Sequence, residues 1–160
     1  MGSTPSGLGV LTLAGPGLGR ENGTVPGKEA SISNVETVQV LIVDDQPPFR
    51  AVARTVVGLT PGFEVVAEAA SGEEAVELAH GVRPGLVLMD INLPGTNGID
   101  ATRRILAAVP STVVILLSTY DAGSLPPDAL DCGAARYVHK EDFSSAVMRE
   151  AWQDAHGTTP

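Results

Sequence analysis

Residues 86–100 read LVLMDINLPGTNGID, and this stretch decides the fold. Four apolar residues run directly into Asp90, and a segment with one proline and two glycines follows it. A short apolar run that ends at turn residues is typical of a strand buried on both faces. Strands of this kind belong to parallel sheets, whose two faces are covered by helices. Asp90 is therefore expected at the end of a buried strand, where the chain turns into a loop.

Segments with the character of strands and of helices alternate along the rest of the chain. Each expected strand is followed by a segment with apolar residues at helical spacing. This alternation predicts an α/β fold of three layers, with a doubly wound, five-stranded parallel sheet between two layers of helices. The expected strands are 38–43, 63–69, 86–89, 112–117 and 136–138. The last expected helix carries Phe143, Ala146, Val147 and Ala151.

Local signals predict where two of the helices begin and end. Ser71 and Glu74 have the spacing of a capping box, and Gly81 stands where a helix end favours glycine. Pro126–Pro127 is expected to open a short fourth helix that ends near Cys132. The neighbouring acidic residues of the second helix, Glu73 and Glu77 among them, indicate a solvated face.

Composition limits the possible functions. The chain has 160 residues, 43% of them hydrophobic, and a formal net charge of −9. A nucleic-acid backbone requires clustered Lys and Arg, so this balance argues against DNA or RNA as the main partner. No apolar run approaches the about 20 residues of a membrane helix, and we expect a cytoplasmic protein without a membrane partner. The single cysteine, Cys132, excludes an internal disulfide and is expected to be a small buried residue.

The chain divides into three parts by composition. Residues 1–36 are rich in Gly, Pro and Ser and show no persistent period, which predicts a disordered N-terminal tail. Residues 37–156 form the expected domain, and residues 157–160 a C-terminal tail. The glycines of the N-terminal tail do not predict a nucleotide-binding loop, because no strand precedes them and no helix follows.

Polar residues stand at the ends of four expected strands. The first strand is followed by Asp44 and Asp45, and the others end at Asp90, at Ser118–Thr119 and at His139–Lys140. In a parallel sheet these ends share one edge, which is where binding sites of such folds lie. The sequence therefore predicts three carboxylates, a hydroxyl and an ammonium group at one edge of the sheet.

Clustered carboxylates repel one another and need a cation. Oxygen ligands with open water positions suit Mg²⁺, and we expect Asp44, Asp45, Asp90 and the backbone carbonyl of Asn92 to hold it. Lys140 would add a second positive charge. Asp90 stands alone beside the loop and is the best candidate for a nucleophile that takes up a phosphoryl group.

Other interpretations remain open for each residue taken singly. Asp44 and Asp45 could cap the following helix, Asp90 could be an ordinary loop acid, and Lys140 a surface lysine. An aspartate-nucleophile phosphatase of the haloacid-dehalogenase type is another candidate, but it usually has a second Asp two residues after the nucleophile. That position is Asn92, which cannot act as a general acid.

Four segments, taken in order, resemble the signature segments of response-regulator receiver domains of bacterial two-component signalling. The segments are VLIVDDQPPFR (40–50), LVLMDINLPGTNGID (86–100), VVILLSTYD (113–121) and ARYVHKED (135–142). The resemblance implies a flavodoxin-like, CheY-like fold with strand order 2-1-3-4-5. It also implies a signalling protein that catalyses only its own phosphorylation and dephosphorylation.

The resemblance assigns individual functions to the residues at the edge of the sheet. It implies that Asp90 accepts a phosphoryl group from a histidine kinase or phosphotransfer protein, with Mg²⁺ as cofactor. Ser118 would hydrogen-bond the phosphoryl oxygen, Lys140 would pair with it, and Tyr137 would be the aromatic switch residue. The surface of helix four, strand five and helix five would then change and bind a downstream protein or a second copy.

Three features depart from many receivers. Glu141 follows the lysine where many receivers have proline, which indicates the NarL-like branch. Thr119 is larger than the residue usual at its position. The two prolines of 121–134 put the usual output surface in doubt, so a protein-binding scaffold that is never phosphorylated stays an alternative. The sequence has no helix-turn-helix segment or basic stripe, so we expect no direct DNA binding by this chain, whether it stands alone or continues into a longer regulator.

Overall fold

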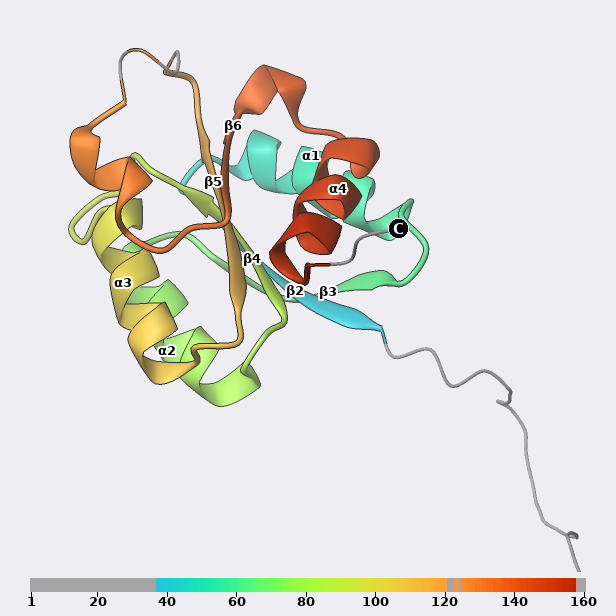
Figure 1. Cartoon of the computed structure of the whole chain (residues 1–160), viewed down its shortest axis with the longest axis horizontal. Helices are drawn as coiled ribbons and strands as arrows, with labels where there is room; N and C mark the ends of the chain where they lie inside the picture. The colour runs from blue at the N-terminus through green and yellow to red at the C-terminus, as the bar shows by residue number, and fades with distance from the viewer. Residues whose placement is uncertain (1–36, 121–122, 124, 158–160) are drawn as a thin grey trace, which may run out of the picture. The chain divides into compact units, whose positions relative to one another are not determined.

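The structure is a computed structural model that describes residues 37–120, 123 and 125–157. These residues form a five-stranded parallel sheet of order β3-β2-β4-β5-β6, with helices on both faces (Figure 1). In order along the chain this is 2-1-3-4-5, so the expected doubly wound sheet is confirmed. The predicted tail at 1–36 and all of the predicted C-terminal tail except Gly157 lie outside the described residues.

The elements alternate along the chain as the sequence predicts. The strands are β2 (Val38–Val43), β3 (Phe63–Ala69), β4 (Leu86–Asp90), β5 (Val113–Ser118) and β6 (Arg136–His139). The helices are α1 (Pro47–Gly58), α2 (Gly72–Val82), α3 (Gly98–Ala108) and α4 (Ser145–Ala155). Two short 3-10 helices, η3 (Pro127–Leu130) and η4 (Lys140–Asp142), flank β6.

The order of the strands creates a crevice at the middle of the sheet. The chain passes from β2 outward to β3 and then returns to place β4 on the other side of β2. Because the helices that follow β2 and β4 leave to opposite faces, a crevice opens between the carboxyl ends of these two strands. Asp44 follows β2 and Asp90 ends β4, so both carboxylates stand at this crevice.

Each face of the sheet has its own apolar core. One core packs α2, α3 and η3 against residues such as Leu41, Met89 and Leu116. The other packs α1 and α4 against alternate residues of the same strands, such as Ile42, Leu88 and Leu117. Strands β4 and β5 are buried along their whole length, as continuous apolar runs predict for the centre of a parallel sheet.

Helix α2 begins as predicted but ends later than predicted. The Ser71 side chain accepts a hydrogen bond from the Glu74 amide, while the Glu74 carboxylate accepts one from the amide of Ala70. The prediction that Gly81 caps the helix is wrong. Helix α2 runs on to Val82, and Arg83 caps it with a left-handed φ of 50°. Pro84 is the physical reason, since proline disfavours the helical conformation at the residue before it.

The segment between β5 and β6 differs most from expectation. The helix predicted after Pro126–Pro127 is only the 3-10 turn η3, and the described residues of this segment contain no α-helix. The predicted output surface therefore lacks its first element within the described residues. Pro126 and Pro127 stand at the N-cap and the first position of η3, where proline is tolerated, so they do not by themselves account for its shortness. Cys132 is buried and has a free thiol, as expected.

The remaining differences concern boundaries. Phe143 was expected in the last helix, but it precedes the N-cap Ser144 and caps η4 instead. The Ser144 side chain accepts a hydrogen bond from the Val147 amide, so the helix begins after Ser144. Asp90 is the last residue of β4 itself, and β5 runs from Val113 to Ser118 rather than from residue 112 to 117.

Two glycine substitutions test this description. Gly81→Ala should raise the free energy of unfolding by about 0.5–1 kcal/mol, because alanine favours the helix interior and no atom lies within 4 Å of the added Cβ. Gly98→Ala should instead destabilise the protein strongly, since its Cβ would lie 2.1 Å from the Asp90 carbonyl oxygen. Urea unfolding measures both. A loss of stability in Gly81→Ala would show that Gly81 does cap α2.

Candidate functional site

The carboxyl ends of four neighbouring strands bring the predicted site residues together. Val43 is in register with Met89, Asp90 with Leu117, and Ser118 with His139. The next residues along β2 and β6 are Asp44 and Lys140, which therefore meet above the end of β4. The Nζ atom of Lys140 lies 2.7 Å from Oδ2 of Asp44 and 3.6 Å from Oδ2 of Asp90.

Asp44 is buried at the centre of this group and is held in place by its own neighbours. Its Oδ1 accepts a hydrogen bond of 2.8 Å from the Gln46 amide, and its carbonyl accepts one of 2.6 Å from Arg50. Lys140 approaches Oδ2 at the distance of an ion pair but outside hydrogen-bond geometry, so Oδ2 is buried without a hydrogen-bond donor. Asp44 does not cap the next helix, because Gln46 is the N-cap of α1 and makes no side-chain cap.

Asp90 has the electrostatics of a reactive carboxylate. It is 3% exposed, and its Oδ1 accepts a hydrogen bond of 3.2 Å from the Asn92 amide. Burial, and next the charge of Asp44, raises the pKa of Asp90 from 3.8 to about 6. Lys140 and the Asn92 amide oppose this rise only in part. Perturbed carboxylates of this kind cluster at functional sites.

Lys140 is held by an aromatic ring as well as by the carboxylates. Its ammonium lies 4.7 Å from the centroid of Phe49, whose ring packs in turn against Phe143. A ring face attracts a cation and limits where the ammonium can lie. The sequence placed Phe49 on the buried face of α1, but helical spacing could not show that its ring would meet Lys140.

The donor set at this edge fits a divalent cation. One carboxylate oxygen each from Asp44, Asp45 and Asp90 lies within 4.8 Å of the others, and Asp45 is exposed to solvent. The buried Oδ2 of Asp44 has the Lys140 ammonium at 2.7 Å but no hydrogen-bond donor. A hard cation that keeps several waters, such as Mg²⁺, matches these oxygens and the open side of the cluster. Asn92 adjoins it, since its amide contacts Asp90, and ligation by its carbonyl stays a prediction.

The residues after β5 form a second set of contacts beside the carboxylates. Ser118 is fully buried, and its Oγ accepts a hydrogen bond of 3.0 Å from the Tyr120 amide. The Tyr137 hydroxyl donates to the Tyr120 carbonyl, and its ring packs partly against the core. The Tyr120 hydroxyl reaches Asn92 at 3.5 Å. Tyr120, which the sequence did not single out, thus lies between Ser118, Tyr137 and the Asp90 loop.

Thr119 and His139 join the ends of β5 and β6. Thr119 is exposed, and its carbonyl lies 3.0 Å from Nε2 of His139. Nδ1 of the same ring accepts a hydrogen bond from the Glu141 amide, so Nε2 must carry the proton that it shares with Thr119. His139 is therefore a structural link that fixes the chain on either side of Lys140, and it is absent from the carboxylate cluster.

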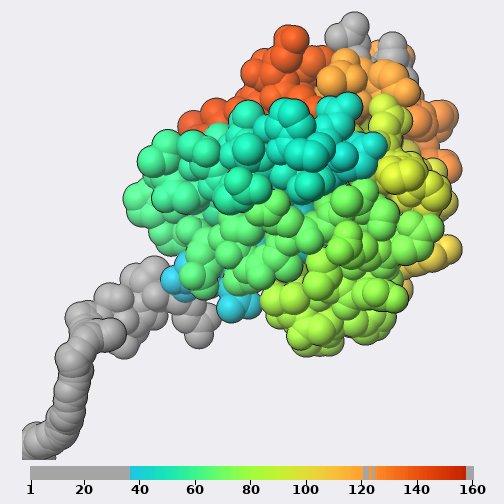
Figure 2. Space-filling model, turned by 180° about the vertical axis from the view of Figure 1, so that it is seen from behind, coloured from blue at the N-terminus to red at the C-terminus, as the bar shows by residue number. Residues whose placement is uncertain are grey.

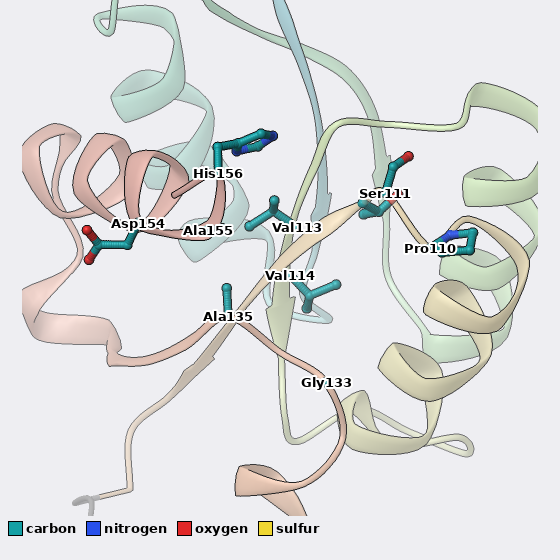
Figure 3. Close-up of a pocket in the computed structure, with 10 residues that line it drawn as sticks. Pro110, Ser111, Val113, Val114, Gly133, Ala135, Asp154, Ala155 and His156 are labelled. Atoms are coloured by element: carbon teal, nitrogen blue, oxygen red, sulfur yellow. The ribbon is translucent and has the colours of Figure 1, made fainter. Parts of the chain in front are cut away.

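A large cleft lies elsewhere in the domain. It has a volume of about 580 Å³ and is lined by the start of β5 and the end of α4, including Val113, Asp154 and His156 (Figure 3). These residues lie at the amino end of β5, about 16 Å along the strand from Ser118. The cleft is therefore separate from the carboxylate cluster, and nothing in its lining repeats the chemistry of that cluster.

The raised pKa of Asp90 predicts how stability depends on pH. An acid whose pKa rises on folding destabilises the folded state above that pKa, so stability should fall as pH rises from about 4 to about 6. The rise from 3.8 to about 6 corresponds to about 3 kcal/mol. Asp90→Asn should therefore stabilise the metal-free protein by about 1–3 kcal/mol at pH 7.5.

Thermal unfolding in the presence of a chelator measures this effect. The difference between the Asp90→Asn variant and the wild type should shrink as the pH falls below 6 and nearly disappear at about pH 3, where most Asp90 carboxyls are protonated in both the folded and the unfolded chain. Asp100→Asn is the control, because Asp100 is an exposed acid on α3. Equal stability of the Asp90→Asn variant and the wild type at pH 7.5 would contradict the electrostatic description of the site.

Comparison with known proteins agrees with this geometry. The response regulator receiver domain family matches residues 40–152. The transcriptional regulatory protein DegU of Brevibacillus brevis is 37% identical over 124 residues, which are 78% of this chain and 52% of DegU. A protein-glutamate methylesterase/protein-glutamine glutaminase of Alkalilimnicola ehrlichii is 42% identical over 64% of this chain and 27% of its own length. The chain thus spans about half or less of these relatives.

Solved structures show the same fold. The signal receiver domain of the putative response regulator NarL from Mycobacterium tuberculosis has a TM-score of 0.69 and 30% identity, covering 76% of this chain and 98% of that domain. This likeness agrees with the NarL-like branch indicated by Glu141. The chain belongs to the response regulator receiver domain family of two-component signalling.

Proposed function

We propose that the protein is a phosphorylatable receiver in a two-component phosphorelay. Asp90 would accept the phosphoryl group from the phosphohistidine of a histidine kinase or phosphotransfer protein. The observation that carries this proposal is the buried Asp90 carboxylate between Asp44 and Lys140, with its pKa raised to about 6. At neutral pH it is ionised yet poorly stabilised, so its oxygen is available as a nucleophile, and Lys140 and a bound cation would have to balance the charge that the phosphoryl group brings.

The chemistry follows from the groups at the rim of the sheet. An Asp90 oxygen attacks phosphorus, the P–N bond to the donor imidazole breaks, and the bond's electron pair stays on the imidazole nitrogen. The product is an acyl phosphate on Asp90. Lys140 lies 3.6 Å from Asp90 and would pair with an oxygen of the transferred group.

Asp44, Asp45, Asp90 and the carbonyl of Asn92 would hold Mg²⁺. When bound, this ion would neutralise the charge that gathers on the transferred oxygens. The fit rests on the close approach of the three carboxylates and on the buried Oδ2 of Asp44. Such a protein catalyses only its own phosphorylation and the hydrolysis of its own acyl phosphate, and it is not an enzyme that acts on metabolites.

The contacts of Tyr120 suggest how phosphorylation would change the surface. Ser118 accepts a hydrogen bond from the Tyr120 amide, and Tyr137 donates to the Tyr120 carbonyl. When the Ser118 hydroxyl turns to the phosphoryl group, the Tyr120 amide loses its acceptor. The peptide units on both sides of Tyr120 can then move, and Tyr137 follows as the switch residue. The changed surface would include β6 and α4, and it would bind a downstream protein or a second copy.

The comparisons and the charge of the chain bear on the kind of downstream partner. DegU is a transcriptional regulatory protein and the other relative is a methylesterase and glutaminase, so similar segments occur in proteins with different functions. The net charge of −9 favours a protein partner over direct contact with DNA by the described domain. The proposal places the protein in the cytoplasm, where receiver domains are generally found. None of the described helices is long and apolar enough to span a bilayer.

Two other functions were open from the sequence. The phosphatase is disfavoured because the side-chain amide of Asn92, two residues after Asp90, does not titrate near neutral pH and cannot act as the general acid. The scaffold that is never phosphorylated is disfavoured because Asp44, Asp45, Asp90 and Lys140 all meet in space. A domain that only binds proteins would avoid this crowding, which lowers stability.

Phosphorylation by a small donor tests the proposal. Incubation with acetyl phosphate and Mg²⁺ should add one phosphoryl group to the wild-type protein, detected by intact mass. The Asp90→Asn variant should take up none, and chelation of Mg²⁺ should abolish uptake by the wild type. Lys140→Ala should slow uptake on the order of tenfold to a hundredfold. An unmodified wild type at saturating donor would favour the scaffold instead.

A further inference from the structure

The first turn of α2 contacts the loop that follows Asp90. Oε2 of Glu73 accepts a hydrogen bond of 3.1 Å from the Thr96 amide and one of 2.9 Å from the Thr96 hydroxyl. The two residues are 23 positions apart in the chain. Glu73 therefore joins a helix on one side of the crevice to the loop between β4 and α3, residues 91–97.

Backbone packing reinforces this contact. A Cβ on Gly72 would lie 2.2 Å from the Thr96 carbonyl oxygen, so the start of α2 fits against the loop only because residue 72 has no side chain. A Cβ on Gly95 would lie 2.7 Å from the Glu73 carboxylate. Gly95 also has a left-handed φ of 70°. The loop is thus shaped around the Glu73 carboxylate as well as bonded to it.

The two ends of the loop are fixed by other contacts. At one end the Asn92 amide donates to Asp90, and at the other the Gly98 amide donates to the carbonyl of Ile91 at 2.9 Å. Between these points Pro94 and Gly95 are exposed. The middle of the loop is held by Leu93, which is buried in the core, and by the Glu73 hydrogen bonds to Thr96, and Asn92 lies in the same short loop.

The three acidic residues of α2 make different contacts, although the sequence grouped them as one solvated face. The Glu74 carboxylate bonds the Ala70 amide and so caps its own helix. Glu77 is exposed on the next turn. Glu73 reaches across to Thr96, and hydrogen bonds from its own amide and from Thr96 lower its pKa below the ordinary value. These hydrogen bonds favour the ionised form of Glu73.

We propose that Glu73 is a positioning residue for the phosphoryl-transfer site, which holds the 91–97 loop so that the carbonyl of Asn92 faces the cation site. This inference rests on the proposed function, because that function assigns Asn92 to the metal. Glu73 contacts neither the metal nor the phosphoryl group. It acts through Thr96 and fixes in advance a ligand that would otherwise have to be ordered when the metal binds.

The test compares Glu73→Ala with Glu77→Ala, a matched loss of one carboxylate from the same helix. Without metal, hydrogen exchange should show the Thr96 amide protected in the wild type and Glu77→Ala, and unprotected in Glu73→Ala. In Mg²⁺ titrations followed by amide NMR shifts, Glu73→Ala should raise Kd about threefold to tenfold, while Glu77→Ala leaves it unchanged. Glu73→Gln keeps an acceptor oxygen and should restore most of the affinity.

The phosphorylation rate gives an independent readout. With acetyl phosphate, Glu73→Ala should need more Mg²⁺ for half-maximal rate but should approach the wild-type rate at saturation. Loss of Thr96 protection with an unchanged Kd for Mg²⁺ would overturn the inference, because Glu73 would then only support the fold. An equal rise of Kd in Glu77→Ala would overturn it as well. A wild type that binds Mg²⁺ but takes up no phosphoryl group would overturn the proposed function alone, since the titrations require no phosphorylation.

Discussion

The repulsion among three carboxylates at one edge of the sheet is the constraint on which the rest of the site depends. Parallel pairing with the observed register leaves no choice about their proximity, because Asp44 and Asp90 leave adjacent strands at the same level. Lys140 is the only ammonium group among the described residues that is paired with both of them. One ammonium balances one of three negative charges, so the folded domain carries a local excess that a cation or a change of protonation must relieve.

The two apolar cores offset the free-energy cost of clustering three carboxylates in a small domain. The central strands are buried on both faces, and the strand ends cannot move apart without breaking the hydrogen-bond ladders of β2, β4 and β5. The burial that stabilises the sheet also removes water from Asp90 and raises its pKa. Stability and reactivity are therefore opposed at this residue, as is common where a functional site sits on a well-packed scaffold.

The sequence predicted those parts of the molecule that depend on local patterns repeated over several residues. Short segments rich in apolar residues located all five strands of the sheet, and the polar residues after them gave Asp44, Asp45, Asp90, Ser118 and Lys140 as neighbours. Single-residue signals were less reliable. Gly81 suggested a helix end that Pro84 in fact sets, and Phe143 continued a helical spacing that Ser144 interrupts.

Side-chain contacts between distant segments could not be predicted from the sequence, for a different reason. Phe49 lies against Lys140 because the sheet brings α1 close to the end of β6. Tyr120 lies between Ser118 and Tyr137 because β5 and β6 are neighbouring strands. Glu73 shows the same limit, since its helical position indicates an exposed residue and gives no sign of Thr96. A pattern along one element specifies which face is buried, while the partner on the other element depends on register and crossing geometry that no single segment contains.

The rim of the sheet is built differently on its two sides. On the side of Asp90, backbone lies directly against backbone at Gly72 and Gly98, and a substitution there meets main-chain atoms that cannot move aside. On the side of Ser118, Thr119 and Tyr120 are joined to β6 by single hydrogen bonds from His139 and Tyr137. A single hydrogen bond contributes only about 0.5–1.5 kcal/mol to stability, so one such contact can be exchanged for another at small cost.

This asymmetry matches what a phosphorylation switch requires. In the proposed function Asp90 and the proposed metal ligands must keep their positions, because a shift of even one ångström would disrupt the transfer geometry. The segment after Ser118 must move in response to the new charge. Such a movement costs little free energy where the backbone is held by exchangeable hydrogen bonds and a 3-10 turn rather than by a packed α-helix. The 3-10 turn η3, which stands where a longer helix was expected, lies on the side that would respond to phosphorylation.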